Sequence, residues 1–168
     1  EIGFTGGEPF MNPDLLAMLG DALGRGFAAL VLTNGMRPMM RCADGLLALR
    51  ARFGDRLALR ISVDHFTPAL HEVERGPRSW APALAGLRWL SDRGFSVTVA
   101  GRTLWGADEP ALRAGYAALF AREGIAVDAA DPAQLVLFPE MDPRVDVPEI
   151  TTACWGLLDK SPDDVMCA

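Results

Sequence analysis

The sequence contains no long hydrophobic run, few cysteines and a single lysine. No stretch of about 18 consecutive apolar residues occurs in the 168 residues, so a membrane partner is not expected. The chain does not open with a charged segment followed by an apolar one, and three cysteines form no disulfide framework. Nothing therefore indicates secretion, and we expect a protein of a reducing, cytoplasmic compartment.

Basic residues are outnumbered and dispersed. Sixteen basic residues stand against 22 acidic ones, which leaves a formal net charge of −6, and the basic residues are scattered among acids rather than gathered in a run. A nucleic-acid partner is therefore not expected, since it would need a basic patch. Hydrophobic residues make up 50% of the chain and charged residues 23%, which excludes disorder and suffices for one sizeable core.

Apolar runs of strand length alternate with segments of helical periodicity. Helices are predicted from Asn12 as N-cap with Pro13 as first residue, over Ala43–Phe53, from Ser79 and from Asp108. The predicted strands are residues 2–5, 28–33, 57–63, 96–100 and 134–138. This order predicts an α/β fold with a parallel sheet. A closed barrel needs about 250 residues, so the alternatives are an open doubly wound sheet and an arc of an incomplete barrel.

Ligands of parallel α/β proteins bind at the carboxyl ends of the strands, so the residues that follow each strand are informative. The first predicted strand leads into Thr5-Gly6-Gly7-Glu8-Pro9. The two glycines would let a ligand approach the backbone, Pro9 fixes the turn, and Glu8 offers a carboxylate that suits an ammonium group. The alternative is an ordinary strand-to-loop turn with a solvated glutamate.

The segment Phe4-Thr-Gly-Gly-Glu-Pro-Phe-Met-Asn-Pro-Asp-Leu resembles the second-strand motif of radical S-adenosylmethionine (SAM) enzymes, in which Gly-Gly-Glu-Pro holds the methionyl amino group. Leu32-Thr33-Asn34-Gly35 and Ser62-Val63-Asp64-His65 are similar to the ends of that family's third and fourth strands, and residues 71–76 resemble the usual continuation. The resemblance covers roughly residues 1–140. It implies a partial parallel (β/α) barrel, truncated at its first βα unit.

The resemblance also implies how S-adenosyl-L-methionine would bind. Glu8 and the backbone of the two glycines would meet its amino group, and Ser62 with Asp64 would meet the ribose hydroxyls or the methionine moiety. Arg102 would pair with the methionyl carboxylate, unless it forms a surface ion pair. Phe138 stands where the family often lines the adenine, but we expect it to be a core residue. The expected cofactor-binding residues are Gly6, Gly7, Glu8, Pro9, Thr33, Ser62, Asp64 and Arg102.

The cysteines depart from the family pattern. The defining Cys-x-x-x-Cys-x-x-Cys motif, which ligates a [4Fe-4S] cluster, is absent. In this family the motif lies just before the point where this chain begins, so we expect a fragment with its cluster ligands upstream, itself inactive. Cys154 and Cys167 resemble the opening pair of a C-terminal auxiliary iron–sulfur (SPASM-like) domain, and the alternative is two unrelated cysteines. Cys42 is expected to be structural.

The domain expectation is a radical SAM core over residues 1–140, which holds strands two to six of the family barrel, and a linker with a truncated extension over 141–168. With its cluster the intact enzyme would reductively cleave SAM to a 5′-deoxyadenosyl radical, which abstracts hydrogen from an unknown substrate. A peptide or small molecule is favoured as substrate, and an external electron donor would be needed. The alternatives are a non-catalytic α/β module that binds a small molecule and a purely structural βα fragment.

Three further expectations concern residues outside these motifs. His65 and His71, six residues apart on a predicted loop, lack metal-ligand spacing and should be solvated or structural. Trp105 is the tryptophan considered for a substrate pocket. The strand over 2–5 should leave an unpaired apolar edge.

Overall fold

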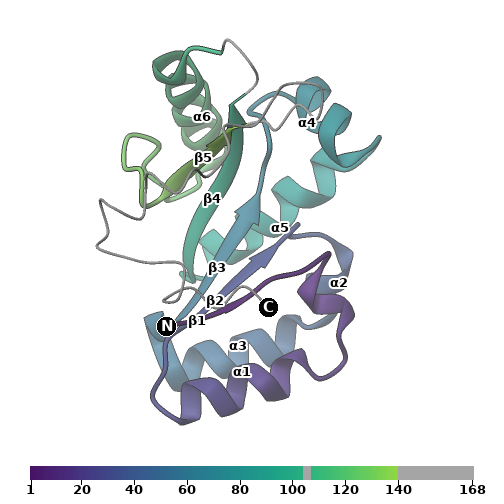
Figure 1. Ribbon diagram of the computed structural model, residues 1–168, viewed down its shortest axis with the longest axis vertical. Helices are drawn as coiled ribbons and strands as arrows, with labels where there is room; N and C mark the ends of the chain where they lie inside the picture. Colours follow the sequence, from purple (N-terminus) through teal and green to yellow (C-terminus); the bar gives the residue numbers. More distant parts are fainter. Residues whose placement is uncertain (104–106, 140–168) are drawn as a thin grey trace, which may run out of the picture.

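The computed structural model describes residues 1–103 and 107–139 (Figure 1). Five strands form one sheet, in which every neighbouring pair is parallel. The strands are β1 (Ile2–Phe4), β2 (Ala29–Thr33), β3 (Leu57–Ser62), β4 (Ser96–Thr103) and β5 (Leu135–Pro139). The helices are α1 (Leu15–Gly24), α2 (Arg37–Arg41), α3 (Ala43–Phe53), α4 (Pro68–Arg75), α5 (Trp80–Asp92) and α6 (Glu109–Glu123), with 3₁₀ turns η1 (Pro9–Met11) and η2 (Gly54–Arg56).

The order of the strands in the sheet follows their order in the chain, β1-β2-β3-β4-β5. A doubly wound sheet reverses its order at a switch point, whereas here each strand pairs with the next one along the chain. Successive right-handed crossovers then place the helices on one side of the sheet. In Figure 1 the helices accompany the curved sheet from α1 at the bottom to α6 at the top. The fold is an arc of a parallel (β/α) barrel, which confirms the predicted partial barrel.

The two faces of the sheet differ in burial. Side chains along a strand point alternately to opposite faces, and in β3 Leu59 and Ile61 are fully buried whereas Arg60 and Ser62 are half-buried. Strand β2 repeats the alternation. The buried set packs against the helices, and the half-buried set forms the other face, which we call the concave face.

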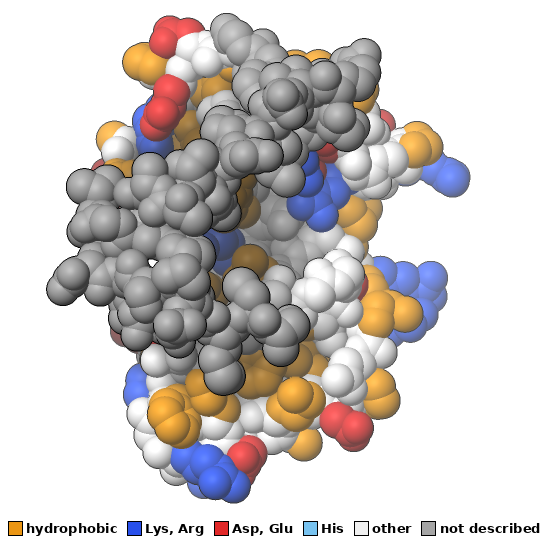
Figure 2. Space-filling model, in the orientation of Figure 1, with side chains coloured by type: hydrophobic (Ala, Val, Ile, Leu, Met, Phe, Trp, Pro, Cys, Tyr) orange, Lys and Arg blue, Asp and Glu red, His pale blue; other side chains and the backbone are white. Residues whose placement is uncertain are grey.

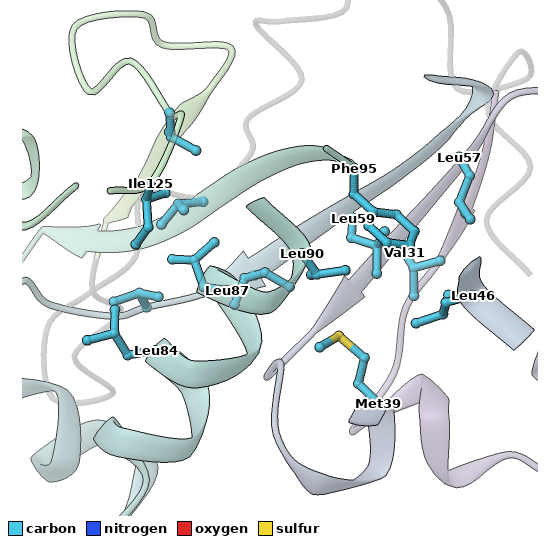
Figure 3. Close-up of a cluster of buried hydrophobic side chains, with 14 of the residues drawn as sticks. Val31, Met39, Leu46, Leu57, Leu59, Leu84, Leu87, Leu90, Phe95 and Ile125 are labelled. Atoms are coloured by element: carbon cyan, nitrogen blue, oxygen red, sulfur yellow. The ribbon is translucent and has the colours of Figure 1, made fainter. Parts of the chain in front are cut away.

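The hydrophobic core fills the space between the sheet and the helices (Figure 3). Val31 and Leu59 come from adjacent strands, and side chains of helices α2, α3 and α5 and of the loops after α5 and α6 close over them. Each leucine-sized side chain that is fully buried here contributes about 1.5–3 kcal/mol to folding. Other members of this core are Met39, Leu46, Leu57, Leu84, Leu87, Leu90, Phe95 and Ile125.

Helix α5 approaches the loop after β2 so closely that a glycine is required. A Cβ atom on Gly86 would lie 1.8 Å from the carbonyl oxygen of Gly35, a distance that backbone atoms cannot relieve by a rotamer change. This contact fixes the position of the loop that follows β2. That loop borders the hollow described below.

Element boundaries differ from the predictions at a few points. The first helix begins at Leu15 rather than Pro13, because Asn12 Oδ1 accepts a hydrogen bond from the Asp14 backbone N–H at 2.9 Å and forms a turn, which leaves Asp14 as N-cap. Helices α2 and α4 were not predicted. They have 5 and 8 residues, and α4 buries one residue, His71, so neither carries an apolar stripe.

At the edge of the sheet, β1 pairs with β2 alone within the described ranges, as expected of an edge strand. Ile2 and Phe4 on this strand are half-buried. Between residues 1 and 103 and between 107 and 139, the helices are all too short or too polar to cross a bilayer.

Candidate functional site

The carboxyl ends of the strands surround a hollow made of two adjoining cavities, of about 130 and 230 Å³. Both are lined by Leu32, Ser62 and Arg75, so they lie side by side, and Figure 2 shows the face of the molecule hollowed near its middle. The first cavity is also lined by Thr5, Gly6, Gly7, Thr33 and Asn34. The second is also lined by Asp64, Ala100, Gly101, Arg102 and Phe138.

Most of the predicted site residues meet at this hollow. Six of them line it, namely Gly6, Gly7, Thr33, Ser62, Asp64 and Arg102. The Glu8 carboxylate accepts hydrogen bonds from two of the lining residues, Thr33 and Asn34. Pro9 is buried as the first residue of η1, directly after the diglycine turn and Glu8. It therefore packs under that turn and does not line the hollow.

The diglycine turn after β1 leaves its backbone uncovered by side chains, and open space lies beside both glycines. Gly6 has φ of +143°, a conformation that favours glycine. Gly7 has an ordinary backbone conformation, and a Cβ atom on it would meet nothing within 4 Å. Packing and backbone strain therefore do not account for the glycine at position 7. The open space beside it lets a ligand contact the main chain.

The Glu8 carboxylate is held by three donors. Thr33 Oγ1 donates to it at 2.8 Å from Oε1, the Asn34 backbone N–H donates to Oε2 at 2.9 Å, and the Phe10 backbone N–H donates to Oε1 at 3.1 Å. A carboxylate has about four acceptor positions, so one remains for a further donor. The bonds from Thr33 and Asn34 tie the turn after β1 to the end of β2.

Asp64 and Arg75 form an ion pair at the boundary of the two cavities. The Asp64 side chain is 3% exposed, and the Arg75 guanidinium donates to it from Nε at 2.5 Å and from Nη2 at 3.1 Å. The Arg75 side chain is 29% exposed. The sequence analysis did not identify Arg75 as a site residue because it lies at the end of a helix that had not been predicted.

Arg102 combines the two alternatives considered for it, since it lines the hollow and also takes part in ion pairs. Its Nε lies 3.7 Å from Asp64 Oδ1, its Nη1 lies 3.8 Å from Glu74 Oε2, and its backbone N–H donates to the Asp64 carbonyl at 3.0 Å. Two guanidinium groups thus face one buried carboxylate, with Glu74 as the second acid. The role of Arg102 toward a methionyl carboxylate remains a prediction.

Two buried side chains fix the end of β3 beside the hollow. His71 Nδ1 accepts the Asp64 backbone N–H at 3.2 Å, and the Tyr116 hydroxyl donates to the Val63 carbonyl at 2.7 Å. Burial lowers the pKa of His71, and burial together with the charge of Asp64 raises the pKa of Tyr116. Because Nδ1 is an acceptor, the neutral imidazole carries its proton on Nε2, which has no hydrogen-bond partner among the described residues.

The two histidines are structural rather than solvated, because His65 is 7% and His71 0% exposed. The predicted loop is wrong for His71, which lies in α4. The expectation that Phe138 is a core residue is also wrong. Its side chain is 46% exposed and lines the hollow, because it aligns with Arg102 in the sheet register and so falls on the concave face.

The described residues do not fit an iron–sulfur cluster. Cys42 is a free, half-buried cysteine at the start of α3, and no group of three His, Cys, Asp or Glu side chains within these ranges could hold a metal ion. The predictions for Cys154, Cys167, Trp105 and the segment 141–168 concern positions outside the described residues.

Residues 1–111 match the sequence model of the Radical SAM superfamily. A crystal structure of Streptococcus suis SuiB bound to S-adenosylmethionine is similar with a TM-score of 0.59 and 10% identity, and the match covers 84% of this chain and 30% of SuiB. Another SuiB structure has a TM-score of 0.57, 11% identity and coverage of 94% and 34%. SuiB bound to the precursor peptide SuiA has a TM-score of 0.52, 11% identity and coverage of 73% and 26%.

These structural matches show a shared fold, and the chain spans about a third of the length of SuiB or less. Among curated proteins, none is similar enough in sequence to count as a match.

Proposed function

The chain belongs to the radical SAM superfamily, and we propose that residues 1–139 form the part of such an enzyme that binds S-adenosyl-L-methionine. One observation carries the proposal. An open diglycine backbone, an anchored carboxylate and two arginines meet at a single hollow, on the segments whose motifs resemble the family. S-adenosylmethionine carries an ammonium group, a carboxylate and a ribose. The residues around the hollow offer a carboxylate, two arginines and a serine hydroxyl to match them.

The diglycine end of the hollow suits the methionyl ammonium group. The free acceptor position of Glu8 is able to take a charge-assisted hydrogen bond from it. The backbone of Gly6 and Gly7 is accessible there, since no side chain shields it. Thr33 fixes the carboxylate rather than contacting the ligand directly.

The methionyl carboxylate is bonded to the same carbon as the ammonium group, so we assign it to Arg75, which lines both cavities, and we assign the ribose to the second cavity. Arg75 uses Nε and Nη2 on Asp64, which leaves Nη1 for the ligand, and Arg102 is near enough to contribute a second cation. The Ser62 hydroxyl has no hydrogen-bond partner among the described residues and lines both cavities, so it is available to the ribose hydroxyls. Asp64 is already engaged with Arg75, and we assign it to orienting that arginine.

The superfamily's [4Fe-4S] cluster, when bound, supplies the electron that cleaves S-adenosylmethionine reductively. The sequence from 1 to 168 contains no Cys-x-x-x-Cys-x-x-Cys motif, so we propose that the cluster ligands come from chain outside these residues and that residues 1–168 alone are inactive. An external electron donor completes the proposal. Because SuiB has been crystallised with a precursor peptide, a peptide is our favoured substrate class, followed by a small molecule.

The deciding experiment compares two glycines in the full-length enzyme with its cluster reconstituted anaerobically. Neither Gly7 nor Gly24 has any atom within 4 Å of its virtual Cβ, but only Gly7 lines the hollow. We expect Gly7→Ala to weaken S-adenosylmethionine binding at least tenfold by calorimetry, and Gly24→Ala to leave it unchanged. Glu8→Gln should cost about 1–3 kcal/mol of binding, the scale for a charged group left without its partner.

Activity is measured as 5′-deoxyadenosine release with a strong reductant. Equal binding by the Gly7→Ala variant and the wild type would contradict the proposed site. A full-length protein that assembles a cluster and binds S-adenosylmethionine but releases no 5′-deoxyadenosine would instead favour the non-catalytic binding module.

A further inference from the structure

Arg60 is a charged residue in the middle of a strand, on the concave face of the sheet. Its sheet neighbours are Leu32 on β2 and Thr98 on β4, and along β3 it follows Ala58 and precedes Ser62 on the same face. None of these four neighbours carries a charge. A guanidinium group on this face therefore has no counter-charge from the adjacent positions of the sheet.

Arg60 lies beside the hollow on the concave face, and it is not itself among the residues that line either cavity. Its register partner Leu32 lines both cavities, and so does Ser62, two residues further along β3. Arg60 is half-buried, so its guanidinium is partly shielded from water and partly accessible. Figure 2 shows basic side chains within the hollowed part of this face.

The guanidinium is oriented but not neutralised by the described residues. Its Nε donates to Thr98 Oγ1 at 3.1 Å, which fixes the plane of the group. The two terminal nitrogens have no hydrogen-bond partner, and no carboxylate forms an ion pair with Arg60, among residues 1–103 and 107–139. A half-buried charge without a partner is energetically unfavourable. A ligand that supplies the counter-charge and the hydrogen-bond acceptors would remove that cost.

We propose that Arg60 binds a carboxylate of the substrate and so selects substrates that carry one, such as an acidic residue or the free C-terminus of a peptide. The terminal nitrogens of an arginine match the two oxygens of a carboxylate, and one cation balances its single negative charge. This inference rests on the proposed function, since Arg60 lies below the residues assigned to S-adenosylmethionine. It specifies the substrate class for the part of the concave face beside that hollow.

The test uses the full-length protein with ¹⁵N-labelled arginine, and follows the Nε–H signal of Arg60 by NMR. The signal is assigned by its absence in the Arg60→Lys variant. The probes are N-acetylalanine, its uncharged amide and inorganic phosphate, each titrated in the presence of S-adenosylmethionine. We expect N-acetylalanine to shift the signal saturably, and the amide to shift it at least fivefold less at the same concentration.

The Arg60→Gln variant should lose the preference for carboxylate over amide, measured as the ratio of the two dissociation constants. Arg88→Gln is the matched control, because Arg88 is exposed on α5 and pairs with Glu123 at 3.2 Å, and it should keep the ratio. Thr98→Val is a second variant that keeps the charge but removes the orienting hydroxyl, and should reduce the ratio at least twofold.

Three outcomes would overturn the inference. They are equal shifts by the amide and the carboxylate, saturation by phosphate at a lower concentration than by N-acetylalanine, and an unchanged ratio in Arg60→Gln. Release of 5′-deoxyadenosine is measured on the same samples. If 5′-deoxyadenosine is not released although N-acetylalanine shifts the Arg60 signal, the result contradicts the proposed function alone. If 5′-deoxyadenosine is released but N-acetylalanine does not shift the signal, the result contradicts this inference alone.

Discussion

Leu59 and Arg60 are neighbours in β3 but occupy opposite environments. Leu59 is fully buried in the core between sheet and helices, whereas Arg60 is half-buried on the concave face, where its one polar partner among the described residues is Thr98. Because successive side chains of a strand point to opposite faces, β3 places its core residues on one face and its polar, ligand-accessible residues on the other. On the helix-facing side, core packing limits the size and shape of the residues. The concave side accommodates polar groups whose partners would come from a ligand.

The largest effect should come from truncating matched leucines on the two faces. Leu59→Ala leaves a cavity in a closed core and should lower the free energy of unfolding by about 2–5 kcal/mol. Leu32→Ala removes the same atoms from a half-buried position that borders the hollow, and should cost about 1 kcal/mol. Urea unfolding measures both. Equal losses would show that the concave face is packed as tightly as the core.

The second prediction compares two helix glycines. Gly86→Ala places a methyl group against the Gly35 carbonyl and should destabilise by about 3 kcal/mol, because backbone must move. Gly20→Ala has only the Leu49 Cδ2 atom at 3.7 Å, an ordinary contact, and should stabilise by up to about 1 kcal/mol through helix propensity. Thermal unfolding of both variants checks the prediction. A stable Gly86→Ala variant would show that α5 can withdraw from the loop.

A third prediction concerns the ion pair of Asp64 and Arg75 at the boundary of the two cavities. Arg75→Leu leaves the buried Asp64 carboxylate with Arg102 at 3.7 Å, and should cost about 2 kcal/mol, less than a fully buried pair because Arg75 is partly exposed. Arg25→Leu, which breaks an exposed pair with Asp21 on the outer helix α1, should leave the urea midpoint unchanged. If the two variants were equally stable, Asp64 would have to be solvated in the protein.

The smallest effect is a pH dependence from His71. Burial is the main cause that lowers its pKa, Arg75 acts in the same direction, and Asp64 and Glu72 oppose them. Below the ordinary value of 6.5 the unfolded chain binds a proton that the folded protein does not, so the free energy of unfolding should fall as pH decreases from 7.5 to 5.5. The slope for one proton cannot exceed about 1.4 kcal/mol per pH unit.

His71→Asn should flatten that profile, and a profile unchanged by this substitution would assign the proton to another group. The pKa of His65 is lowered by burial too, so a residual slope of the same sign is expected in the variant.

The parts of the fold that were predicted from sequence are those with a local signal. Strand β3 and the turn at Gly6 and Gly7 were found because alternation and glycine pairs can be read within a few residues. Arg75 was missed because its role depends on α4, a helix without an apolar stripe, reaching back to Asp64. The Phe138 error has a similar cause, since the face that a residue occupies in β5 is set by pairing with β4.

The bonds from Thr33 and Asn34 to Glu8 have a consequence for ligand affinity. They join two strand ends before any ligand is present, so the carboxylate is preorganised and its rotamers are already restricted. An ammonium group that binds there would lose its own freedom but would not have to immobilise the glutamate, which otherwise adds about 0.5–1.5 kcal/mol to the entropic cost of binding. The turn that follows the edge strand β1 thus presents a rigid contact, although β1 is only three residues long and has one neighbour in the described sheet.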